Sequence, residues 1–520
     1  MVGRGELPNL AAMMQEGTHT DLLSVYPHNS VAAWASFQTG LNPGRHGLYD
    51  FYESGTYERA VVTAERLRGR TMWEILSQAG CRVGAINVPV TYPPRPVNGF
   101  LIPGVLTPQR ERVPTYPPGL LDGVPEYVVE PVSPLMRTHV GDMDYLESLA
   151  ESIVTRGRIA LQLARDWPWD FLAIVFTETD RLQHFFWKVV DPTHPAYDPD
   201  KAPALAQGFQ ECYRRIDRAL GALKDLAGEQ ALVMVVSDHG FGPVTKGIDL
   251  TAWLAQLGYL AFVREGGRSL AQEAYRLAQR LDVLKLRRFL PSRAVARISR
   301  QIHLPQVDWR RTTAYPGTLA DQGIYINLKG REPGGTVEPG AEYEALRDRL
   351  IVDLASLAEP QTGGRVVSRV LRREEVLSGE FAHLAPDLFL EPMDETHVFV
   401  NRLRDGYHIG LEPEHVYGLS GHHRKKGIFV AAGPCIQALG RSEELQIVDI
   451  CPTVLYAMGV PAPDDLDGHI IRQIFSGEFK RGQGLRRARA SEHAVGDSAP
   501  AFLAEEEKQV RDRLRGLGYL

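Results

Sequence analysis

The chain has 520 residues, 44% of them hydrophobic and 23% charged, which is the composition of an ordinary globular protein. Its 58 Lys and Arg against 64 Asp and Glu give a net charge of 58 − 64 = −6, so no nucleic acid polymer is expected among its partners. The four cysteines are scattered, so we expect no disulfide framework. No apolar run reaches about 18 residues and no apolar leader follows Met1, so we expect neither a membrane-spanning helix nor a signal peptide. A cytoplasmic location is therefore expected.

The amino-terminal part of the chain places a hydroxyl group at the start of a helix. We expect a strand at Leu22–Tyr26 and a helix at Val31–Gly40 that is closed by its glycine. Ser30 stands where this helix begins. Its hydroxyl is either an N-cap that accepts a backbone N–H bond, or a nucleophile that faces a metal, with the helix amino end stabilising the phosphoryl oxygens.

Helices and apolar strands alternate along the next part of the chain. The expected elements are a helix at Arg70–Gly80, a strand at Cys81–Val88, a helix over about 145–165, a strand at Phe171–Phe176, a helix over about 205–223 and a strand at Ala231–Ser237. Helix-then-strand order with continuously apolar strands is typical of parallel sheets covered on both faces. We therefore predict a doubly wound α/β fold with a mostly parallel sheet flanked by helices.

Asp180 and His184 follow the strand Phe171–Phe176 closely. Their i, i+4 spacing in a first helical turn aims both side chains at one point. A carboxylate oxygen and an imidazole nitrogen so placed suit zinc or a similar divalent ion. Taken alone, such a pair is more often a surface carboxylate beside a helix histidine, so the prediction depends on matching fragments elsewhere.

Two further fragments offer the same ligand types. Asp238 and His239 end the strand Ala231–Ser237, and because both need partners at the end of a buried strand, we favour metal ligation. The glycines that follow form neither a G-x-G-x-x-G pattern nor a P-loop, which excludes a nucleotide-binding loop. The pair His422-His423 lies in a glycine-flanked loop ahead of an apolar strand, and by itself this loop is equally well an ordinary surface loop.

The remaining sequence suggests an insertion into the core. Residues 263–379 are expected to form a lid or cap, with a basic helical region over about 267–300 and a small β-α-β unit after it. We interpret the basic region as a solvated helical pair; the alternative is a lid that attracts an anionic substrate or a lipid head group. Residues 1–262 and 380–480 would form a discontinuous core, and residues 481–520 a polar linker and a last helix.

Taken in order, these motifs resemble those of the alkaline phosphatase superfamily. They are Ser30…Thr39-Gly40…His46-Gly47, Asp180-x-x-x-His184, Asp238-His239-Gly240 and Gly421-x-His423-Arg424-x-x-Gly427. The set is most similar to the bacterial type I phosphodiesterase/nucleotide pyrophosphatase-like branch, which includes phosphohydrolases and phosphomutases. The similarity runs from about Leu7 to about Phe475 and so covers most of the chain.

The resemblance implies a metal-dependent phosphoester hydrolase with a small-molecule substrate and two divalent ions. Zinc is the expected ion, with manganese or iron as alternatives. Two-metal sites of this kind promote in-line displacement at phosphorus. The implied residues are Ser30 as nucleophile, Asp180, His184 and His423 for one ion, Asp238 and His239 for the other, His422 as the alternative to His423, and Arg45, Lys246 and Arg424 as candidate phosphate contacts.

This sequence departs from the family pattern at its start. The family begins with an apolar strand that ends in an aspartate ligand of the second metal, whereas this sequence begins after that point, and Asp50 is not at that motif. Loss of a central strand implies a groove flanked by unpaired backbone groups, which are costly when buried. We expect a start site placed inside a longer reading frame; the alternative is weak binding of the second metal.

Three other functions stay open at this point. A phosphomutase would use the same phosphoseryl intermediate and return the phosphoryl group to its substrate. A metal-binding or scaffold protein without turnover would follow from the missing aspartate. Sulfate ester hydrolysis is disfavoured, because Ser30-Val-Ala-Ala-Trp34 does not match the C/S-x-P-x-R motif of sulfatases.

Overall fold

The structure is a computed structural model. It describes residues 1–54, 57, 60–108, 113–122, 124, 127–131, 141–263, 307–320, 322–359, 362–401, 409–411, 416, 418–489 and 502–517. Its helices are α1 (Pro8–Glu16), α2 (Ser30–Thr39), α3 (Pro43–His46), α4 (Met72–Gln78), α5 (Asp142–Asp166), α6 (Glu178–Val190), α7 (Ala202–Ala227), α8 (Leu250–Gln256), α11 (Ala341–Ala355), α12 (Arg373–Val376), α13 (Ile450–Ala457), α14 (Gly477–Gly482) and α15 (Ala504–Gly516).

The strands are short, and several lie outside the core. They are β1 (Thr18–Leu23), β2 (Val83–Val88), β3 (Gly99–Pro103), β4 (Phe171–Ile174), β5 (Val233–Val236), β6 (Gly240–Pro243), β7 (Lys246–Asp249), β8 (Ala314–Pro316), β9 (Gly323–Ile326), β10 (Val367–Arg372), β11 (Leu388–Pro392), β12 (His397–Val400), β13 (Ile409–Leu411), β14 (Gly421–Arg424), β15 (Lys426–Ala432), β16 (Gly440–Arg441), β17 (Leu445–Gln446), β18 (Ala462–Pro463) and β19 (Arg487–Ala488).

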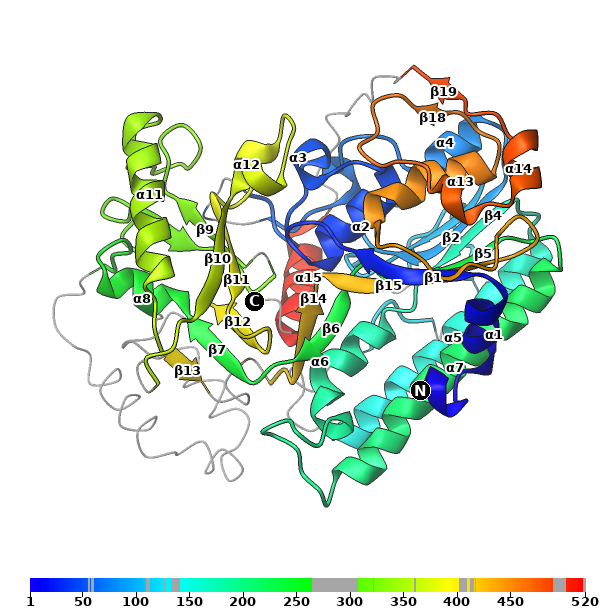
Figure 1. Ribbon diagram of the computed structural model, residues 1–520, viewed down its shortest axis with the longest axis horizontal. Coiled ribbons are helices and arrows are strands. Elements are labelled where there is room, and N and C mark those ends of the chain that lie inside the picture. Colours follow the sequence, from blue (N-terminus) through cyan, green and yellow to red (C-terminus); the bar gives the residue numbers. More distant parts are fainter. Residues whose placement is uncertain are drawn as a thin grey trace.

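The core sheet consists of two pieces that lie next to one another (Figure 1). One piece has the strand order β16-β1-β15-β5, with β17 also paired to β1, and the other has the order β3-β2-β4. Strand β2 is parallel to both of its neighbours, whereas β15 is antiparallel to β1 and to β5. The predicted α/β architecture is therefore present, with β15 running against the mostly parallel direction that we expected.

Helices cover both faces of this sheet. On one face, α2, α4 and α13 contribute Trp34, Phe37, Trp73 and Leu455 to a large buried cluster with the strands. On the other face, α1 and α7 pack against β5 and β15, and α5 packs against β2 and β3. Burial on both faces explains why the core strands are continuously apolar instead of alternating.

Helix α2 begins with Ser30 and is capped by the preceding residue. The Asn29 side chain accepts a hydrogen bond from the Ala32 N–H at 3.0 Å, and Gly40 ends the helix in the left-handed conformation with φ 70°. Asparagine is among the best N-cap residues, and a glycine at the C-cap carries no Cβ penalty at this φ. The N-cap interpretation of Ser30 is therefore wrong, since Asn29 caps the helix and leaves the Ser30 hydroxyl available for another contact.

Strands β4 and β5 differ from the buried strands that their apolar sequences suggest. All four residues of each are only half-buried, whereas β2 is buried along its whole length. Each is the last strand of its sheet piece, so one edge has no strand beside it. A cavity of about 1320 Å³ separates the two edges. The groove that the resemblance implied is thus found between β4 and β5.

Beside the core, a second lobe has its own small sheet (Figure 1). The sheet order is β10-β11-β9-β8, and helix α11 packs on β10. The β9-α11-β10 succession agrees with the expected β-α-β unit, although β11 lies beyond residue 379, where we placed the boundary of the insertion. The basic region over 267–300 lies outside the described residues. Of the helices in the described ranges, none is both long and apolar enough to cross a membrane.

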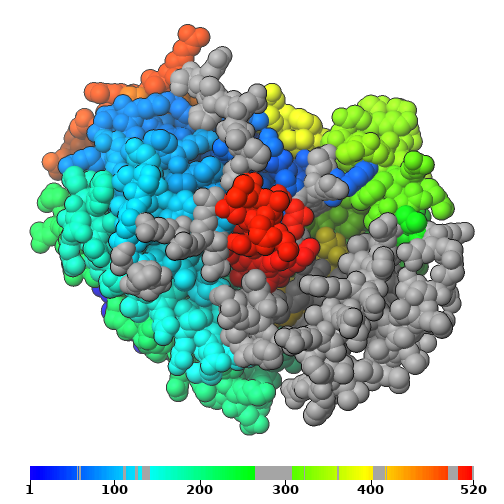
Figure 2. Space-filling view, turned by 180° about the vertical axis from the view of Figure 1, so that it is seen from behind, coloured from blue at the N-terminus to red at the C-terminus, as the bar shows by residue number. Residues whose placement is uncertain are grey.

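The last helix, α15, packs close to the helix that carries Ser30. Val510 and Leu514 belong to one buried cluster with Val31 and Ala35 of α2. The Arg513 guanidinium donates hydrogen bonds to the carbonyls of Val105 and Thr107 at 3.2 and 2.9 Å. Seen from the opposite side, α15 lies in the middle of that face of the molecule, as the red surface in Figure 2.

His46, in the turn after α2, is buried as a neutral imidazole. The Leu48 N–H donates to its Nδ1 at 3.2 Å, so Nε2 carries the proton and donates to the Ser36 hydroxyl at 3.0 Å. Burial lowers the pKa of His46 from 6.5 to about 3. Because the unfolded chain binds a proton below pH 6.5 and the folded chain does not, this residue's contribution to stability is fully present above pH 6.5 and falls as the pH drops towards 3.

We expect the variant His46→Gln to lose stability less steeply on acidification than the wild type. Between pH 6.5 and 4.5 the difference in slope should be about 1.4 kcal/mol per pH unit. Denaturant unfolding of the metal-free proteins at several pH values measures it. Identical slopes for the two proteins would contradict a neutral, buried His46.

Candidate active site

Helix α6 places two of the predicted ligands. It begins at Glu178, a short connection after β4, so Asp180 and His184 lie in its first turns on one side. Asp180 Oδ1 is 3.5 Å from His184 Nε2. The His184 backbone carbonyl accepts a hydrogen bond from the Ser420 N–H at 2.7 Å, which ties α6 to the segment that carries the third predicted ligand.

His423 lies on a strand and not in the loop that we expected. Strand β14 pairs with β6 in an antiparallel hairpin, with His422 opposite Gly242 and His423 opposite Phe241. Successive residues of a strand point to opposite faces. The His423 ring therefore faces Asp180 and His184, and its Nε2 lies 3.2 Å from Asp180 Oδ1 and 3.0 Å from His184 Nε2.

In the tautomers that these histidines adopt, the Nε2 atoms of His184 and His423 turn their lone pairs towards each other and towards Asp180 Oδ1. His184 Nδ1 lies 2.9 Å from the Gly421 carbonyl, and His423 Nδ1 lies 3.0 Å from the His28 carbonyl. A carbonyl only accepts, so both Nδ1 atoms carry the ring proton and both Nε2 atoms present lone pairs. With Asp180, these ligand atoms all lie within 4.8 Å of one another. Such a convergence of acceptors fits a cation, and the donor set of one carboxylate and two imidazoles suits a divalent metal.

The surroundings of Asp180, His184 and His423 favour a carboxylate anion and two neutral imidazoles. Burial lowers the pKa of His184 to about 4 and that of His423 well below its usual value. Burial by itself raises the pKa of Asp180, but His184 and Arg181 outweigh it and hold the carboxyl pKa well below its usual range. Metal ligands must be deprotonated. The three groups are therefore ready to bind a metal ion at neutral pH.

A second cluster joins the predicted nucleophile to the other predicted ligands. The Ser30 hydroxyl lies 3.2 Å from His239 Nε2, and His239 Nε2 lies 3.2 Å from Asp238 Oδ2. His239 Nδ1 donates to the Gly240 carbonyl at 3.1 Å, so Nε2 is again an acceptor. Burial raises the pKa of Asp238, whose Oδ2 is buried without a hydrogen-bond partner. A buried orphan oxygen beside an imidazole lone pair also fits a cation.

The two clusters are parts of one site. The rings of His239 and His423 stack with their centroids 3.6 Å apart, and His239 Nε2 is 3.9 Å from Asp180 Oδ1. The structure thus brings together all six residues for which we predicted a direct role; they are Ser30, Asp180, His184, Asp238, His239 and His423. His422 lies next to the site, but its buried Nε2 has no hydrogen-bond partner.

The three candidate phosphate contacts are bonded elsewhere. Arg45 forms ion pairs with Asp465 at 3.0 Å and with Asp467 at 3.4 Å. Lys246 pairs with Glu359. The Arg424 guanidinium donates to the carbonyls of His422, His423 and Pro243 and so fastens the β6–β14 hairpin. In this structure Arg424 supports the strand that carries His423, and phosphate binding by these three residues stays a prediction.

A buried ion pair that the sequence pattern did not reveal supports Asp180. The Arg181 guanidinium contacts Asp180 Oδ2 through Nη1 and Glu130 Oε2 through Nε, the latter at 3.1 Å. Arg181 and Glu130 are 3% and 0% exposed in their side chains, so the pair is isolated from water. By holding Oδ2, Arg181 leaves Oδ1 to face the two histidines. The adjacency of Asp180 and Arg181 was visible in the sequence, but the position of Glu130 was not.

We expect the variant Arg181→Met to weaken metal binding at the Asp180 cluster by about 10- to 100-fold, since a ligand that loses its supporting hydrogen bond is less well oriented. The double variant Arg181→Met/Glu130→Gln keeps this defect without leaving an unpaired buried carboxylate, which alone costs about 3–5 kcal/mol of stability. Competition with a chromophoric chelator measures the affinity. Wild-type metal affinity in the folded double variant would contradict a role for Arg181 in positioning Asp180.

This chain is similar to known proteins in sequence and in fold. The sequence profile of the type I phosphodiesterase/nucleotide pyrophosphatase family matches residues 1–423. Phosphonoacetate hydrolase from Sinorhizobium meliloti 1021, solved with phosphonoacetate, is 15% identical over 86% of this chain and 89% of its own, with a TM-score of 0.52. Human ectonucleotide pyrophosphatase/phosphodiesterase 5 is 14% identical over 91% of this chain and 95% of its own, with a TM-score of 0.47. No curated protein sequence matches the chain.

The chain belongs to the type I phosphodiesterase/nucleotide pyrophosphatase family, as the resemblance implied. The similarity to phosphonoacetate hydrolase confirms the α/β fold that we expected. The protein is a metal-dependent hydrolase of phosphoester bonds in small-molecule substrates.

Proposed function

We propose that this protein hydrolyses phosphodiester or pyrophosphate bonds with Ser30 as the nucleophile and two divalent ions as cofactors. The observation that carries the proposal is the meeting of Ser30 with two sets of metal-type ligands around one point. Asp180, His184 and His423 would hold the first ion, and Asp238 and His239 would hold the second beside the Ser30 hydroxyl. Zinc is our choice, because it prefers imidazole and carboxylate ligands.

When bound, the ions would lower the pKa of the nucleophile and neutralise charge on the phosphoryl oxygens. The chain's own contribution is the placement of Ser30. Its Oγ attacks phosphorus in line with the leaving group, so that a bond from phosphorus to Oγ forms as the bond to the leaving oxygen breaks. Water then releases the phosphoryl group from Ser30 and restores the hydroxyl.

The helix that carries Ser30 also favours this reaction. Ser30 is the first residue of α2, a helix of ten residues, so a phosphoryl group on its Oγ lies at the positive end of the helix dipole. The fixed position of the serine contributes as well, because Asn29 caps the helix, and its Nδ2 donates to the Tyr49 carbonyl at 2.7 Å. Rigid placement of a nucleophile reduces the entropy that must be lost in the transition state.

Product analysis on a substrate panel tests this function. The chain is stripped with a chelator, reloaded with zinc, manganese or iron, and assayed on a bis-aryl phosphate, an aryl monoester and a dinucleotide. We expect hydrolysis of the diester or the dinucleotide, with loss of activity on chelation and recovery on reloading. Transfer of the phosphoryl group to a second site of the substrate would identify a phosphomutase instead, and bound metal without turnover would contradict catalysis altogether.

A further inference from the structure

The segment just ahead of Ser30 borders the active site. The His28 carbonyl accepts a hydrogen bond from His423 Nδ1 at 3.0 Å, and Ser30 follows two residues later. The His28 ring lies against the Tyr26 ring, with the two centroids 4.4 Å apart. Both side chains are only half-buried, as is Ser30, so this side of the site is open to solvent. The two rings thus form a wall that leads away from Ser30.

Tyr26 is held in place by strand β11 of the second lobe (Figure 1). Its hydroxyl donates a hydrogen bond to Glu391 Oε1, and its ring lies 5.9 Å from that of Phe389 between centroids. Burial and the hydrogen bond to Glu391 raise the pKa of Tyr26, so the hydroxyl keeps its proton. Arg369 Nη1 lies 3.6 Å from Glu391 Oε2. The charges of Arg369 and Glu391 therefore offset one another, and neither is available to a substrate.

A lysine ammonium group lies over this wall. Lys425 Nζ is 5.3 Å from the centroid of the Tyr26 ring, a distance at which a cation is attracted by the face of an aromatic ring. The Lys425 carbonyl accepts a hydrogen bond from the Ser24 N–H at 2.9 Å, which fixes the base of the side chain next to the same segment. The side chain itself is exposed. Lys425 therefore presents a positive charge to solvent beside the open side of the site.

The two neighbours of Lys425 are also cations, but both are engaged elsewhere. The Arg424 guanidinium donates to three backbone carbonyls. Lys426 pairs with Glu444, and its Nζ lies 3.7 Å from Asp21 Oδ2. Among the described residues, Lys425 Nζ has neither a carboxylate nor a carbonyl as partner. Its charge is therefore the one of these three that a bound ligand can use.

The charge of Lys425 also acts on the active site. Burial lowers the pKa of His28 to about 4, and the neighbouring Lys425 and His239 lower it further. Lys425 and His239 are thus both within electrostatic range of the His28 ring. An imidazole with this pKa is neutral at pH 7. Lys425, and not His28, therefore supplies the positive charge on this side of the site.

We propose that Lys425, placed over Tyr26, forms a subsite for a second phosphate group of the substrate, which lies beyond the phosphoester that Ser30 attacks. The inference rests on the proposed function, because it takes the reacting phosphorus to be at Ser30. An ammonium group has three N–H donors and binds phosphate as a point charge on a flexible stem. A neutral group at the same place gains nothing from it. The subsite therefore favours substrates with a second phosphate over substrates with a neutral tail.

Binding of non-hydrolysable ligands tests the subsite. The zinc-loaded protein is titrated calorimetrically with α,ω-alkane bisphosphonates of about two to five methylene groups, a spread that matches the flexible lysine stem, and with alkylphosphonates of equal length. We expect the best-fitting bisphosphonate to bind the wild type at least about tenfold more tightly than its alkylphosphonate, as a hydrogen bond between charged groups provides. In Lys425→Met the preference should fall to the factor of about two that two equivalent ends give. Lys425→Arg should keep most of it.

The adjacent lysine supplies the matched control. Lys426→Met removes a cation that already pairs with Glu444 and Asp21, so it should keep the wild-type preference. An unchanged affinity for the alkylphosphonate shows in each variant that the metal site is intact. Equal preferences in the wild type and in Lys425→Met would overturn the proposal. An equal loss in Lys426→Met would also overturn it, because the preference would then come from the general field of the surface.

Turnover separates the subsite from the proposed reaction. The substrates are two 4-nitrophenyl phosphodiesters whose second alcohol ends in a phosphate or in a hydroxyl. We expect Lys425→Met to raise KM about tenfold for the phosphate-bearing diester alone, with kcat unchanged for both. No turnover of either diester, together with a Lys425-dependent preference in binding, would contradict the proposed reaction and retain the subsite. Turnover without such a preference in binding or in KM would retain the reaction and overturn the subsite.

Discussion

Replacing Ser30 with alanine abolishes phosphoester turnover and leaves the bound metal unchanged; this is the largest effect that we expect. The Ser30 hydroxyl lies 3.2 Å from His239 Nε2 at the amino end of α2, and no covalent intermediate can form without it. Loss of a nucleophile lowers kcat by at least about a thousandfold. Steady-state kinetics on the best diester substrate, together with metal analysis of the same preparation, measures both quantities.

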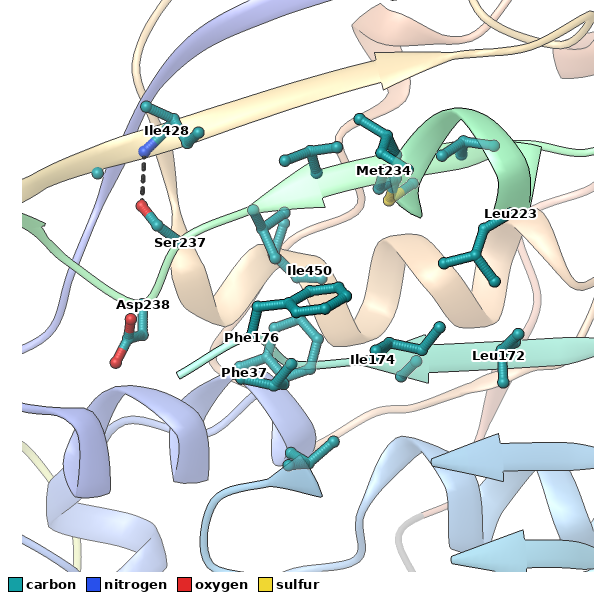
Figure 3. Close-up of a pocket in the computed structure, with 18 of the residues that line it drawn as sticks. Phe37, Leu172, Ile174, Phe176, Leu223, Met234, Ser237, Asp238, Ile428 and Ile450 are labelled. Carbon is teal, nitrogen blue, oxygen red and sulfur yellow. Dashed lines mark hydrogen bonds between the residues drawn. The ribbon is translucent and has the colours of Figure 1, made fainter. Parts of the chain in front are cut away.

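Two comparisons make this experiment specific. The variant Ser30→Thr keeps a hydroxyl at the same place and should retain measurable turnover. Ser237→Ala is the matched control, because the Ser237 hydroxyl accepts a hydrogen bond from the Ile428 N–H of the neighbouring strand β15 at 2.8 Å and has no assigned part in the chemistry (Figure 3). If Ser30→Ala keeps full activity, a water molecule and not the serine attacks phosphorus.

The second large effect distinguishes two adjacent histidines. We expect His423→Ala to lose the ion of the Asp180 cluster and more than about 99% of the activity, since catalytic zinc sites depend on three protein ligands. His422→Gln should retain both, because His422 does not belong to the group of possible ligands and its Nε2 has no hydrogen-bond partner to lose. Metal stoichiometry by mass spectrometry and initial rates on the same samples separate the two outcomes.

A folding defect in the His423 variant would also lower the metal content and the activity, and so has to be distinguished from the loss of a metal ligand. His423 also donates through Nδ1 to the His28 carbonyl, so its removal disturbs the segment just ahead of Ser30. The variant His423→Gln keeps a polar side chain and serves as a second test, and unfolding in denaturant reports any general loss of stability. Metal loss from His422→Gln instead of the His423 variants would reverse the assignment.

The part of the site that could be predicted from sequence is the part that depends on local spacing. Asp180 and His184 are four residues apart in a helix, and Asp238 and His239 are adjacent after a strand, so their chemistry is visible in short segments. The choice between His422 and His423 required the register of β14 against β6, which no local pattern contains. Family resemblance made that choice; in the structure His423 lies with Asp180 and His184 in a group that could hold a metal ion.

What could not be predicted depends on partners that are distant in the sequence. Arg181 and Glu130 are 51 residues apart, and many carboxylates in the sequence would have paired equally well with this arginine. Arg424 matched the position of a phosphate contact, yet three backbone carbonyls take its donors. The half-burial of β4 and β5 was hidden as well, because an apolar run indicates burial without indicating which neighbours supply it.

The packing of α15 against α2 has a consequence for biosynthesis. Val510 and Leu514 complete the apolar surroundings of Val31 and Ala35 in α2, the helix that begins with Ser30. A ribosome has to deliver residues 504–516 before that side of α2 is shielded from water. This part of the core can therefore form only after nearly the whole chain has been made, because the helix that completes it lies at residues 504–516.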